Sequence, residues 1–565
     1  MKHNDKSLRA CTPLIAALLA AMSALGAQAA DTVVPSAGSI LQQVQPVTPA
    51  TPAPSGVGLT IERADGAQLP ASVPFEVKSL QLFGNSLFDT QTLNAQVADA
   101  LGQTLTLPQL GALVARITHY YQAHGYPLAR AIIPAQTIAL GVVRVEVIEA
   151  RYGQITLNNH ASVSDALLHA TLAPLQSGQF IAQSKVDPAL LLLSDMPGVE
   201  VNASLKPGEV VGTSDLVVST TSGPAVSGYV AVDSYGNRYT GRERLGGTVN
   251  LINPLHHGDV LSVSGLSSGA GLNYGRIGYD TLLNGQGTRL GGSWSALNYA
   301  LGELLTPLNA HGTAQVASVW ARQPLLRSRD VNLYGQLQFD QTQLRDHIDV
   351  SATQIDRTLN GWTLGLSGDR RDDLILGGTN TWSLGWTQGT VGFDNVAAQL
   401  ADGATAKTQG SFSKWNASLV RLQNLDAAST LYLAFSGQWA NTNLDSSQKM
   451  TVGGPYTVRA YDSGTLSGDS GYLISAELRH NLSAVWGGKW TVVAFVDSAR
   501  VKVNQNTWVA GANNATLSGA GIGLNWSGSQ DWSAKTYVAT PIDSVPTLAG
   551  STSLTRVWVE VNHRF

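Results

Sequence analysis

The sequence is poor in cysteine and in charge. Its only cysteine, Cys11, lies near the N-terminus, so the rest of the chain has no thiol with which to form a disulfide bond. Charged residues make up 13% of the chain, about half of the ~25% typical of soluble domains. The net charge of −4 does not indicate a strongly basic domain, so we expect no nucleic-acid partner.

Long apolar runs are also missing. After the first 29 residues, no stretch of about 20 apolar residues occurs, which excludes a transmembrane helix there. Glycine, by contrast, is abundant at 58 residues, and there are 13 tryptophans. Low charge, many glycines and no spanning helix are typical of a transmembrane β-barrel, and a soluble, secreted β-rich protein is the alternative.

The N-terminus has the pattern of a secretory signal peptide. A basic segment over residues 2–9 precedes an apolar run over 14–25, and small residues follow. This order of a basic, an apolar and a small-residue region predicts a signal peptide over residues 1–29.

Residues 30–72 are expected to form a linker. They are rich in proline, alanine, threonine and glutamine, a composition that favours an extended and flexible chain. Within the linker, the pattern of residues 39–44 allows one or two helical turns, and a disordered segment is the alternative.

Residues 73–152 and 153–222 read as two successive α+β domains. In each, one strand precedes two helices and two further strands. We infer this order from the spacing of the apolar residues, which has a period of 2 in the strands and of 3.6 in the helices. In the first domain we expect strands at 77–82, 129–134 and 142–149 and helices at 89–100 and 107–124. In the second we expect strands at 153–157, 199–205 and 214–220 and helices at 164–172 and 184–193.

Residues 223–565 contain sixteen strand-like runs separated by turns, and nothing there reads as a helix. The runs are expected at about 228–235, 243–253, 258–267, 271–281, 287–299, 310–322, 330–345, 356–368, 373–388, 409–423, 429–441, 470–481, 489–500, 514–527, 531–540 and 553–565. The even number and the alternation of short with long connections favour a closed antiparallel outer-membrane barrel.

The last strand indicates how such a barrel faces its surroundings. Val557, Val559, Val561 and Phe565 share one face, and the other face is largely polar. An outer-membrane barrel turns its apolar face to lipid, whereas a soluble barrel turns it inward. An alternating strand with a C-terminal aromatic residue resembles the signal that the barrel-assembly machinery reads, which implies this role for Val561 and Phe565.

The segment from Tyr120 to Glu149 resembles a polypeptide-transport-associated (POTRA) domain of the two-partner-secretion transporters, which export haemolysins and filamentous haemagglutinin. The resemblance implies that the following residues take part in substrate capture: Tyr121, Gly125, Tyr126, Arg130, Pro134 and Gln136. Segments 196–199, 205–208 and 212–216 resemble the second POTRA domain of that family.

One loop segment resembles the Val-Arg-Gly-Tyr tetrad at the tip of the family's sixth extracellular loop. The implied loop anchor and pore gate consists of Val458, Arg459, Ala460, Tyr461, Phe495 and Asp497. The family pairs the arginine with an aspartate on the inner barrel wall, and strand alternation points Asp497 inward. Alanine replaces the family's glycine at positions 460 and 499, which makes a different turn at the loop tip the expectation.

The resemblance implies an outer-membrane translocator with its POTRA domains in the periplasm. Its partner would be a cognate unfolded exoprotein with an N-terminal secretion domain, and it would work as a monomer in outer-membrane lipid, without nucleotide or other cofactor. The N-terminal helix would act as a pore plug. The alternatives are an outer-membrane insertase of the same superfamily and a plain porin, which would lack the residues 77–220.

Two catalytic look-alikes do not predict an enzyme. Residues 468–471 match a serine-protease tetrapeptide, but a Gly/Ser turn explains them better, because no local pattern supplies the His and Asp of a triad. His256 and His257 are adjacent and have no spaced carboxylate or cysteine partner, so we expect no metal site. We predict no catalytic residue.

Overall fold

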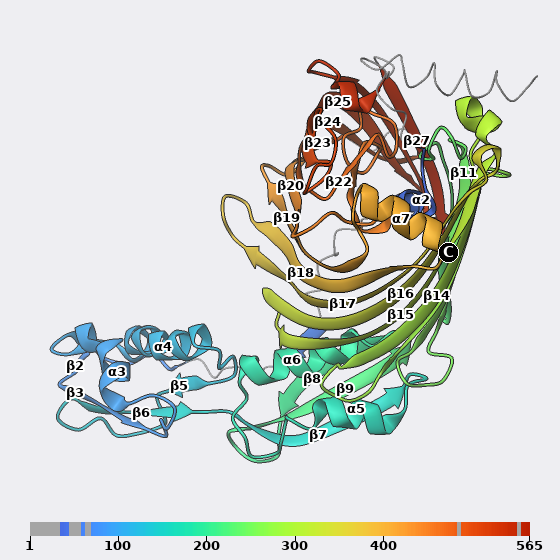
Figure 1. Cartoon of the computed structure of the whole chain (residues 1–565). Coiled ribbons are helices and arrows are strands. Elements are labelled where there is room, and N and C mark those ends of the chain that lie inside the picture. The colour runs from blue at the N-terminus through green and yellow to red at the C-terminus, as the bar shows by residue number, and fades with distance from the viewer. Residues whose placement is uncertain (1–33, 45–57, 63–68, 483–486, 551–554) are drawn as a thin grey trace, which may run out of the picture.

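The computed structural model describes residues 34–44, 58–62, 69–482, 487–550 and 555–565. The predicted signal peptide, Cys11 and most of the linker lie outside these residues. The described chain forms a large barrel with two small α+β domains that extend from one of its ends (Figure 1).

The first α+β domain has the predicted order of elements. Its main sheet has the order β3 (Ser79–Phe83), β6 (Val142–Ile148) and β5 (Arg130–Ile132), with a small pair β2 (Phe75–Glu76) and β4 (Thr104–Leu105) beside it. The predicted first helix is interrupted: Asp89 caps α3 (Thr90–Ala95), and only a 3₁₀ turn over Ala98–Ala100 follows. The second helix, α4 (Leu107–Ala123), buries one apolar face in the domain core and ends before Gly125, which adopts a positive φ of 87°.

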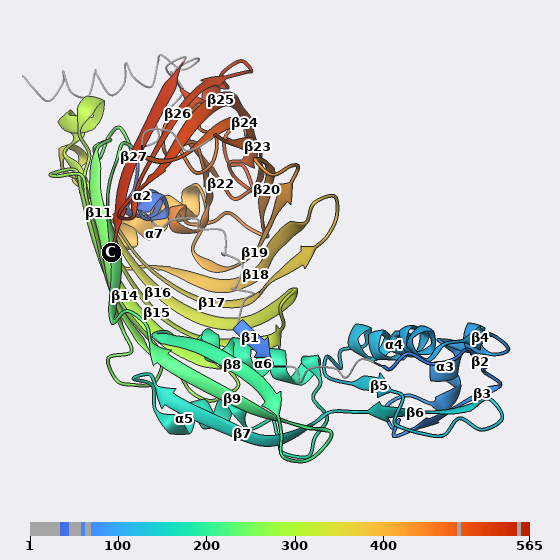
Figure 2. The same ribbon diagram turned by 180° about the vertical axis from the view of Figure 1, so that it is seen from behind.

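The second α+β domain incorporates a piece of the expected linker. Its sheet has the order β1 (Gly58–Ile61), β8 (Val199–Pro207), β9 (Thr213–Ser222) and β7 (Arg151–His160), and its helices are α5 (Asp165–Leu172) and α6 (Gln183–Ser194). β1 pairs in parallel with β8 (Figure 2). An extended, unpaired linker was therefore the wrong expectation for this segment, since it completes a sheet whose other strands lie far along the chain.

The barrel confirms the prediction of sixteen antiparallel strands in a closed sheet. Its strands are β10 (Val226–Asp233), β11 (Arg244–Ile252), β12 (Val260–Ser267), β13 (Leu272–Leu282), β14 (Arg289–Ala300), β15 (Ala310–Arg327), β16 (Val331–Ile348), β17 (Thr353–Asp372), β18 (Gly378–Phe393), β19 (Gly410–Asn424), β20 (Ser429–Ala440), β23 (Ser470–Asn481), β24 (Gly488–Lys502), β25 (Asn514–Gly528), β26 (Trp532–Pro541) and β27 (Arg556–Arg564). Consecutive strands are neighbours, and β10 pairs with β27 to close the cylinder.

The apolar face of the last strand points outward, as an outer-membrane barrel requires. Val557 and Phe565 are 56% and 52% exposed, whereas Trp558 between them is 1% exposed and faces the interior. The same alternation recurs around the barrel, and the exposed apolar side chains form the surface that would meet lipid.

Helical elements in the barrel region correct the expectation that it contains none. α7 (Val396–Ala404) lies in the connection between β18 and β19, and the Asn395 side chain accepts a hydrogen bond from the backbone N–H of Ala398 at its start. This cap gives a local reason for the helix. No helix among the described residues is long and apolar enough to cross a membrane.

The second α+β domain is fastened to one end of the barrel by ion pairs. Arg327 at the end of β15 forms a bidentate pair with Asp195, with N–O distances of 2.7 and 2.9 Å. Arg329 in the next turn pairs with Asp187 in α6 at 3.0 Å. These contacts fix the domain against the barrel end.

Candidate functional site

The connection between β20 and β23 folds back into the barrel. A short hairpin of β21 (Met450–Val452) and β22 (Leu466–Gly468) forms its stem. Gly453 and Gly454 begin the tip with φ of 97° and 109°, which only glycine adopts at low cost. Residues 458–461 lie at this tip, and all four are at least 96% buried.

Arg459 makes a bidentate ion pair with Asp497 on the inner wall of β24. Arg459 Nε donates to Asp497 Oδ2 and Nη2 donates to Oδ1, both at 2.8 Å. The exposed fractions of the two residues are 4% and 0%. The planar guanidinium matches the carboxylate in both hydrogen bonds, which fixes the geometry of the pair and holds the loop tip against the wall.

A second carboxylate and several aromatic rings complete the surroundings of Arg459. Glu477 Oε1 on β23 lies 2.7 Å from Arg459 Nη1, and Arg479 balances this acid at 2.6 Å. The guanidinium also stacks 3.4 Å from the ring centroid of Phe495. The indole N–H of Trp558 donates to the Arg459 carbonyl at 2.7 Å. Every part of this residue therefore contacts the barrel wall.

The alanine at the loop tip is accommodated by a glycine on the wall. Ala460 is fully buried, and a Cβ placed on Gly519 of β25 would overlap the Ala460 Cβ. The wall therefore leaves room for the methyl group that the loop carries. Ala499, the other replacement noted in the sequence, is also buried within this wall.

The loop is fastened again where the barrel closes. Asp462 pairs with Arg242, from the connection between β10 and β11, and with Arg556 of β27, both at 2.5 Å. The Asn237 side-chain amide donates to the Ser463 carbonyl at 2.8 Å. These contacts join the loop to β27 and to the connection that follows β10, next to the closing seam.

Sequence reasoning missed Asp462 and Glu477. Asp462 directly follows the tetrad, and Glu477 lies on the inward face of a strand whose alternation was read correctly. The sequence therefore contained a signal for both residues, but Arg242 and Arg556 lie far from Asp462 along the chain, and Arg459 reaches Glu477 only when the loop folds into the barrel.

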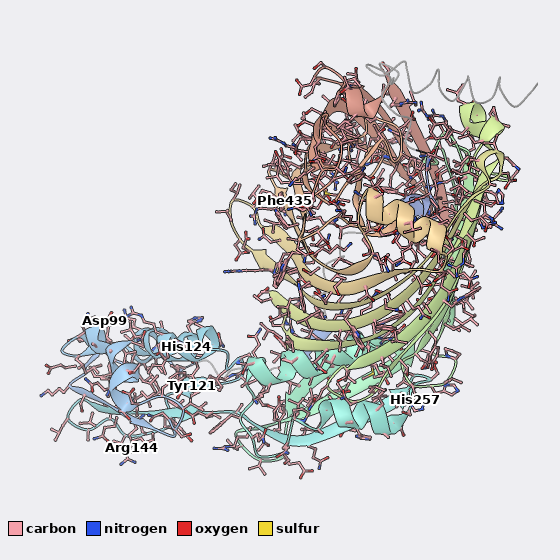
Figure 3. The ribbon with its side chains drawn as sticks, in the orientation of Figure 1. Asp99, Tyr121, His124, Arg144, His257 and Phe435 are labelled. Atoms are coloured by element: carbon pink, nitrogen blue, oxygen red, sulfur yellow. The ribbon has the colours of Figure 1, made fainter. Side chains whose placement is uncertain are left out.

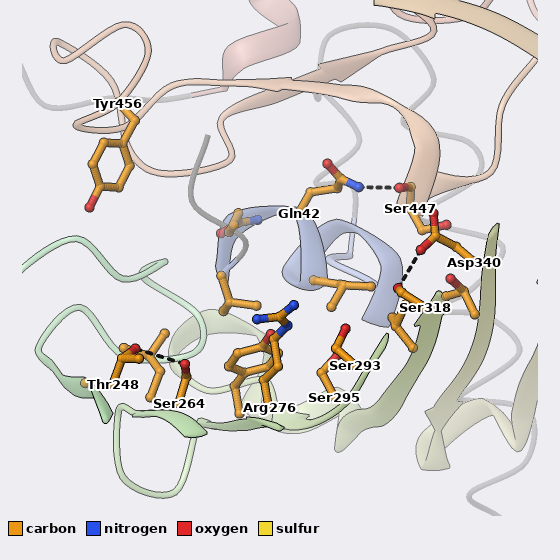
Figure 4. Close-up of a pocket in the computed structure, with 18 of the residues that line it drawn as sticks. Gln42, Thr248, Ser264, Arg276, Ser293, Ser295, Ser318, Asp340, Ser447 and Tyr456 are labelled. Carbon is orange, nitrogen blue, oxygen red and sulfur yellow. Dashed lines mark hydrogen bonds between the residues drawn. The ribbon is translucent and has the colours of Figure 1, made fainter. Parts of the chain in front are cut away.

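A short helix, α2 (Ala37–Val44), lies inside the barrel (Figure 2). The backbone N–H of Ala37 donates to Asp346 Oδ1 on the inner wall at 2.6 Å. Gln42 donates to the Ser447 carbonyl at the base of the loop (Figure 4). A Cβ on Gly38 would lie only 2.6 Å from the Ser447 backbone nitrogen. The helix is therefore closely fitted to both the wall and the loop.

One arginine joins the helix site to the loop base. Arg357 on β17 pairs with Asp346, which holds the start of α2, at 2.8 Å, and with Asp445, which precedes Ser447, at 3.0 Å. Tyr299 also donates its hydroxyl to Asp346 at 2.7 Å. The helix and the loop thus share one buried polar network.

Tyr121, one of the implied capture residues, lies in the core of the first α+β domain (Figure 3). Its hydroxyl donates to Glu149 Oε1 at 2.7 Å, and the backbone N–H groups of Ser86 and Leu87 donate to the same oxygen at 2.8 Å. Burial alone would raise the pKa of Glu149, but the hydrogen bond from the Ser86 hydroxyl, together with these three, outweighs it and lowers the pKa below its ordinary value. Because Tyr121 is buried, it could affect substrate capture only indirectly, by maintaining the shape of the domain.

The other implied capture residues follow α4 in the chain. Gly125 ends the helix, Tyr126 is partly buried, and Arg130 begins β5. The Gln136 side chain, two residues after Pro134, accepts from the Arg144 backbone N–H at 2.8 Å and donates to its carbonyl at 2.7 Å. These two bonds satisfy the backbone of β6 on the side where β5 no longer pairs with it, while β3 pairs with Arg144 on the other side.

The C-terminal residues are paired with the first barrel strand. Phe565 and Gly228 exchange two backbone hydrogen bonds, at 2.8 and 3.1 Å. Val561 and Phe565 both face outward. The chain end is therefore part of the closing seam and of the apolar surface.

The catalytic look-alikes have structural partners. Asp469 is fully buried and pairs with Lys449 at 2.7 Å, and the Ser470 hydroxyl accepts from the Ala440 N–H at 3.0 Å. His256 contacts the Ser162 carbonyl of the second α+β domain through Nδ1 at 2.7 Å. Within the described ranges, no group of three or more His, Cys, Asp or Glu side chains is placed to hold a metal ion.

Comparisons with known proteins agree with this architecture. Residues 212–526 match the family described as haemolysin secretion/activation protein ShlB/FhaC/HecB, and residues 75–150 match the ShlB-type POTRA domain. The heme/hemopexin transporter protein HuxB of Haemophilus influenzae is 28% identical over 485 residues, which cover 85% of this chain and 86% of HuxB. The outer membrane transporter CdiB of Escherichia coli is 23% identical over 491 residues, covering 84% and 79%.

Solved structures show the same fold. CdiB from Escherichia coli superposes with a TM-score of 0.68 at 22% identity, covering 91% of this chain and 94% of that one. BamA from Haemophilus ducreyi, lacking POTRA domains 1–3, gives a TM-score of 0.52 at 14% identity, covering 87% and 100%.

Proposed function

Because the chain belongs to the ShlB/FhaC/HecB family of haemolysin secretion/activation proteins, we propose how it moves its partner exoprotein across the outer membrane. The POTRA domains capture the unfolded exoprotein in the periplasm, and the barrel conducts it to the cell surface. The observation that carries this mechanism is the barrel interior, which is filled by two segments attached to the wall through side chains, α2 and the loop 441–469.

Capture would use the free edges of the first POTRA sheet. β3 and β5 are the outer strands of that sheet, so each offers one unpaired row of backbone groups. Strand addition at such an edge binds an extended chain with little demand on its sequence. In the second POTRA domain, β1 already covers the edge of β8.

Conduction would require α2 to leave the lumen while the loop tip stays in a defined position. The helix is held by one backbone hydrogen bond to Asp346 and by contacts with the loop base. Arg459 and Asp497 are the anchor of the loop tip, and we assign them to the conduction-competent state. No nucleotide is needed if folding outside the cell prevents the exoprotein from sliding back, and we assign no catalytic residue.

The partners we propose are an exoprotein with an N-terminal secretion domain, outer-membrane lipid, and the barrel-assembly machinery during biogenesis. The working form is a monomer, because one chain closes the barrel by itself. Because HuxB is a heme/hemopexin transporter protein, an exoprotein of a heme/hemopexin system is the first cargo to try.

An export assay tests the proposal. The chain and a candidate exoprotein are co-expressed, and the exoprotein is measured in the medium and in the periplasm. Export that requires the transporter supports the proposal, and retention of every candidate in the periplasm contradicts it. Loss of other outer-membrane proteins on deletion of the chain would favour the alternative, an insertase of the same superfamily.

A further inference from the structure

A cavity of about 1020 Å³ lies inside the barrel beside α2 (Figure 4). Five basic and three acidic side chains line it. The charged lining consists of Arg244, Arg276, Lys414, Lys535, Arg564, Asp233, Asp340 and Glu560. The side chains that line the cavity therefore carry a net charge of +2.

Two of the basic residues are already neutralised by neighbours. Arg244 donates to Asp233 at 2.8 Å, and Lys535 lies 3.0 Å from Glu560. Both pairs join adjacent inward positions near the closing seam. They add no net charge to the cavity.

The other three basic residues form no ion pair of this kind, although Asp340 is near enough to Lys414 to attract its charge. Among the described residues, none has a carboxylate oxygen within 4 Å of Arg276, Lys414 or Arg564. Lys414 Nζ donates to the Gln448 carbonyl at 2.8 Å, and Arg276 points into the cavity below α2 (Figure 4).

The remaining acid is held by neutral groups. Asp340 accepts from the Ser318 hydroxyl at 2.5 Å and from the Gln338 amide at 2.9 Å. It forms no ion pair with any residue that the structure describes.

The segment that fills the lumen does not neutralise this excess. α2 has the sequence AGSILQQV, which contains no acid and no base. Charges of one sign in a partly enclosed cavity focus the electrostatic field and raise the local concentration of ions of the opposite sign. The free cations therefore remain available to whatever replaces the helix.

We propose that the unblocked lumen prefers anions and that Arg276, Lys414 and Arg564 bind the carboxylate side chains of an acidic segment in the exported chain. This inference rests on the proposed export function, whose cargo class it narrows. The hydroxyl-rich wall on either side of Arg276, with Thr248, Ser264 and Ser295, supplies neutral donors for the same carboxylates.

Ion selectivity of the full chain in planar bilayers tests the first part. Gly38→Trp should displace α2 from the lumen and so open the channel. If this variant leaves α2 in place, a chain that lacks residues 36–44 provides the open channel instead. We expect a chloride-over-potassium permeability ratio of about fivefold at low salt, since two excess charges act at short range with partial screening.

Neutralising the three free cations should remove the preference. R276Q/K414Q/R564Q should bring the ratio near unity, whereas R144Q, which removes one exposed charge in the first POTRA domain, should leave it unchanged. Poly-glutamate of about 20 residues on the periplasmic side should block at lower concentration than poly-lysine of equal length, because it presents the ligand chemistry proposed. A potassium preference, an unaltered ratio in the triple variant, or equal block by both peptides would overturn the inference.

An export assay distinguishes a failure of this inference from a failure of the proposed function on which it rests. Unchanged export by the triple variant overturns the binding of cargo carboxylates and leaves export standing. Failure of the parent chain to export any candidate contradicts the proposed function, while the permeability ratio still decides the anion preference.

Discussion

Removing the Arg459 side chain should release the loop tip from the barrel wall. In Arg459→Ala, Asp497 and Glu477 would face each other without the guanidinium that now lies 2.8 and 2.7 Å from them. Breaking a buried pair by removing one partner costs about 3–5 kcal/mol, because the other charge stays buried. The local opening of the loop should therefore become at least about 100-fold more frequent.

Hydrogen exchange of the backbone amides at 453–465 measures this opening directly. Arg479→Ala is the matched control: it removes a cation from the same cluster, but its side chain is 33% exposed and Glu477 keeps Arg459. Because the arginine of this pair is partly exposed and the buried Glu477 keeps a second cation, we expect the loss to cost about 1 kcal/mol or less, so exchange should rise about fivefold at most. Export by Arg459→Ala should fall although the barrel still inserts and folds.

Two outcomes would refute the reasoning. Equal exchange in Arg459→Ala and the parent chain would mean that other contacts hold the loop. Equal acceleration of hydrogen exchange in Arg459→Ala and Arg479→Ala would mean that the burial of an ion pair does not determine how strongly it holds the loop.

Three further predictions concern the wall, the plug and the first POTRA domain. Gly519→Ala should displace the loop tip and reduce export, and Ala460→Gly in the same chain should restore it. Gly38→Trp should raise the frequency of channel opening in bilayers, since the Ser447 backbone leaves no space for the ring; unchanged gating would contradict this. Because the pKa of Glu149 is lowered on folding, its stabilisation is complete above the unfolded pKa near 4.5 and is lost as pH falls below it. Hydrogen exchange should show this acid loss in the parent and not in Glu149→Gln, and Asp99→Asn serves as the exposed control.

The strand pattern was predictable because it is local. Each of the sixteen runs alternates along its own sequence, so the assignment of Val557, Val559 and Val561 to one face needed no knowledge of other strands. The helix α7 was missed because its short apolar pattern and the Asn395 cap lie in a long connection between two strands.

Contacts between distant segments were not predictable in the same way. β1 reads as linker until its partner β8, more than a hundred residues later, is placed beside it. The pairing of Arg459 with Asp497 came from the resemblance, since alternation showed only that Asp497 faces inward. Glu477 faces inward on the same evidence, yet only the folded barrel brings it to the same guanidinium.

The contact of Ala460 with Gly519 has a consequence for the interpretation of related sequences. One methyl group occupies the gap between loop and wall, and either position could supply it, but both cannot do so without a shift of the backbone. The two positions should therefore vary together among relatives, so that glycine at one allows a larger side chain at the other. A departure from a family motif at a single position then says little about whether the loop closes, until the residue that contacts it on the barrel wall is known.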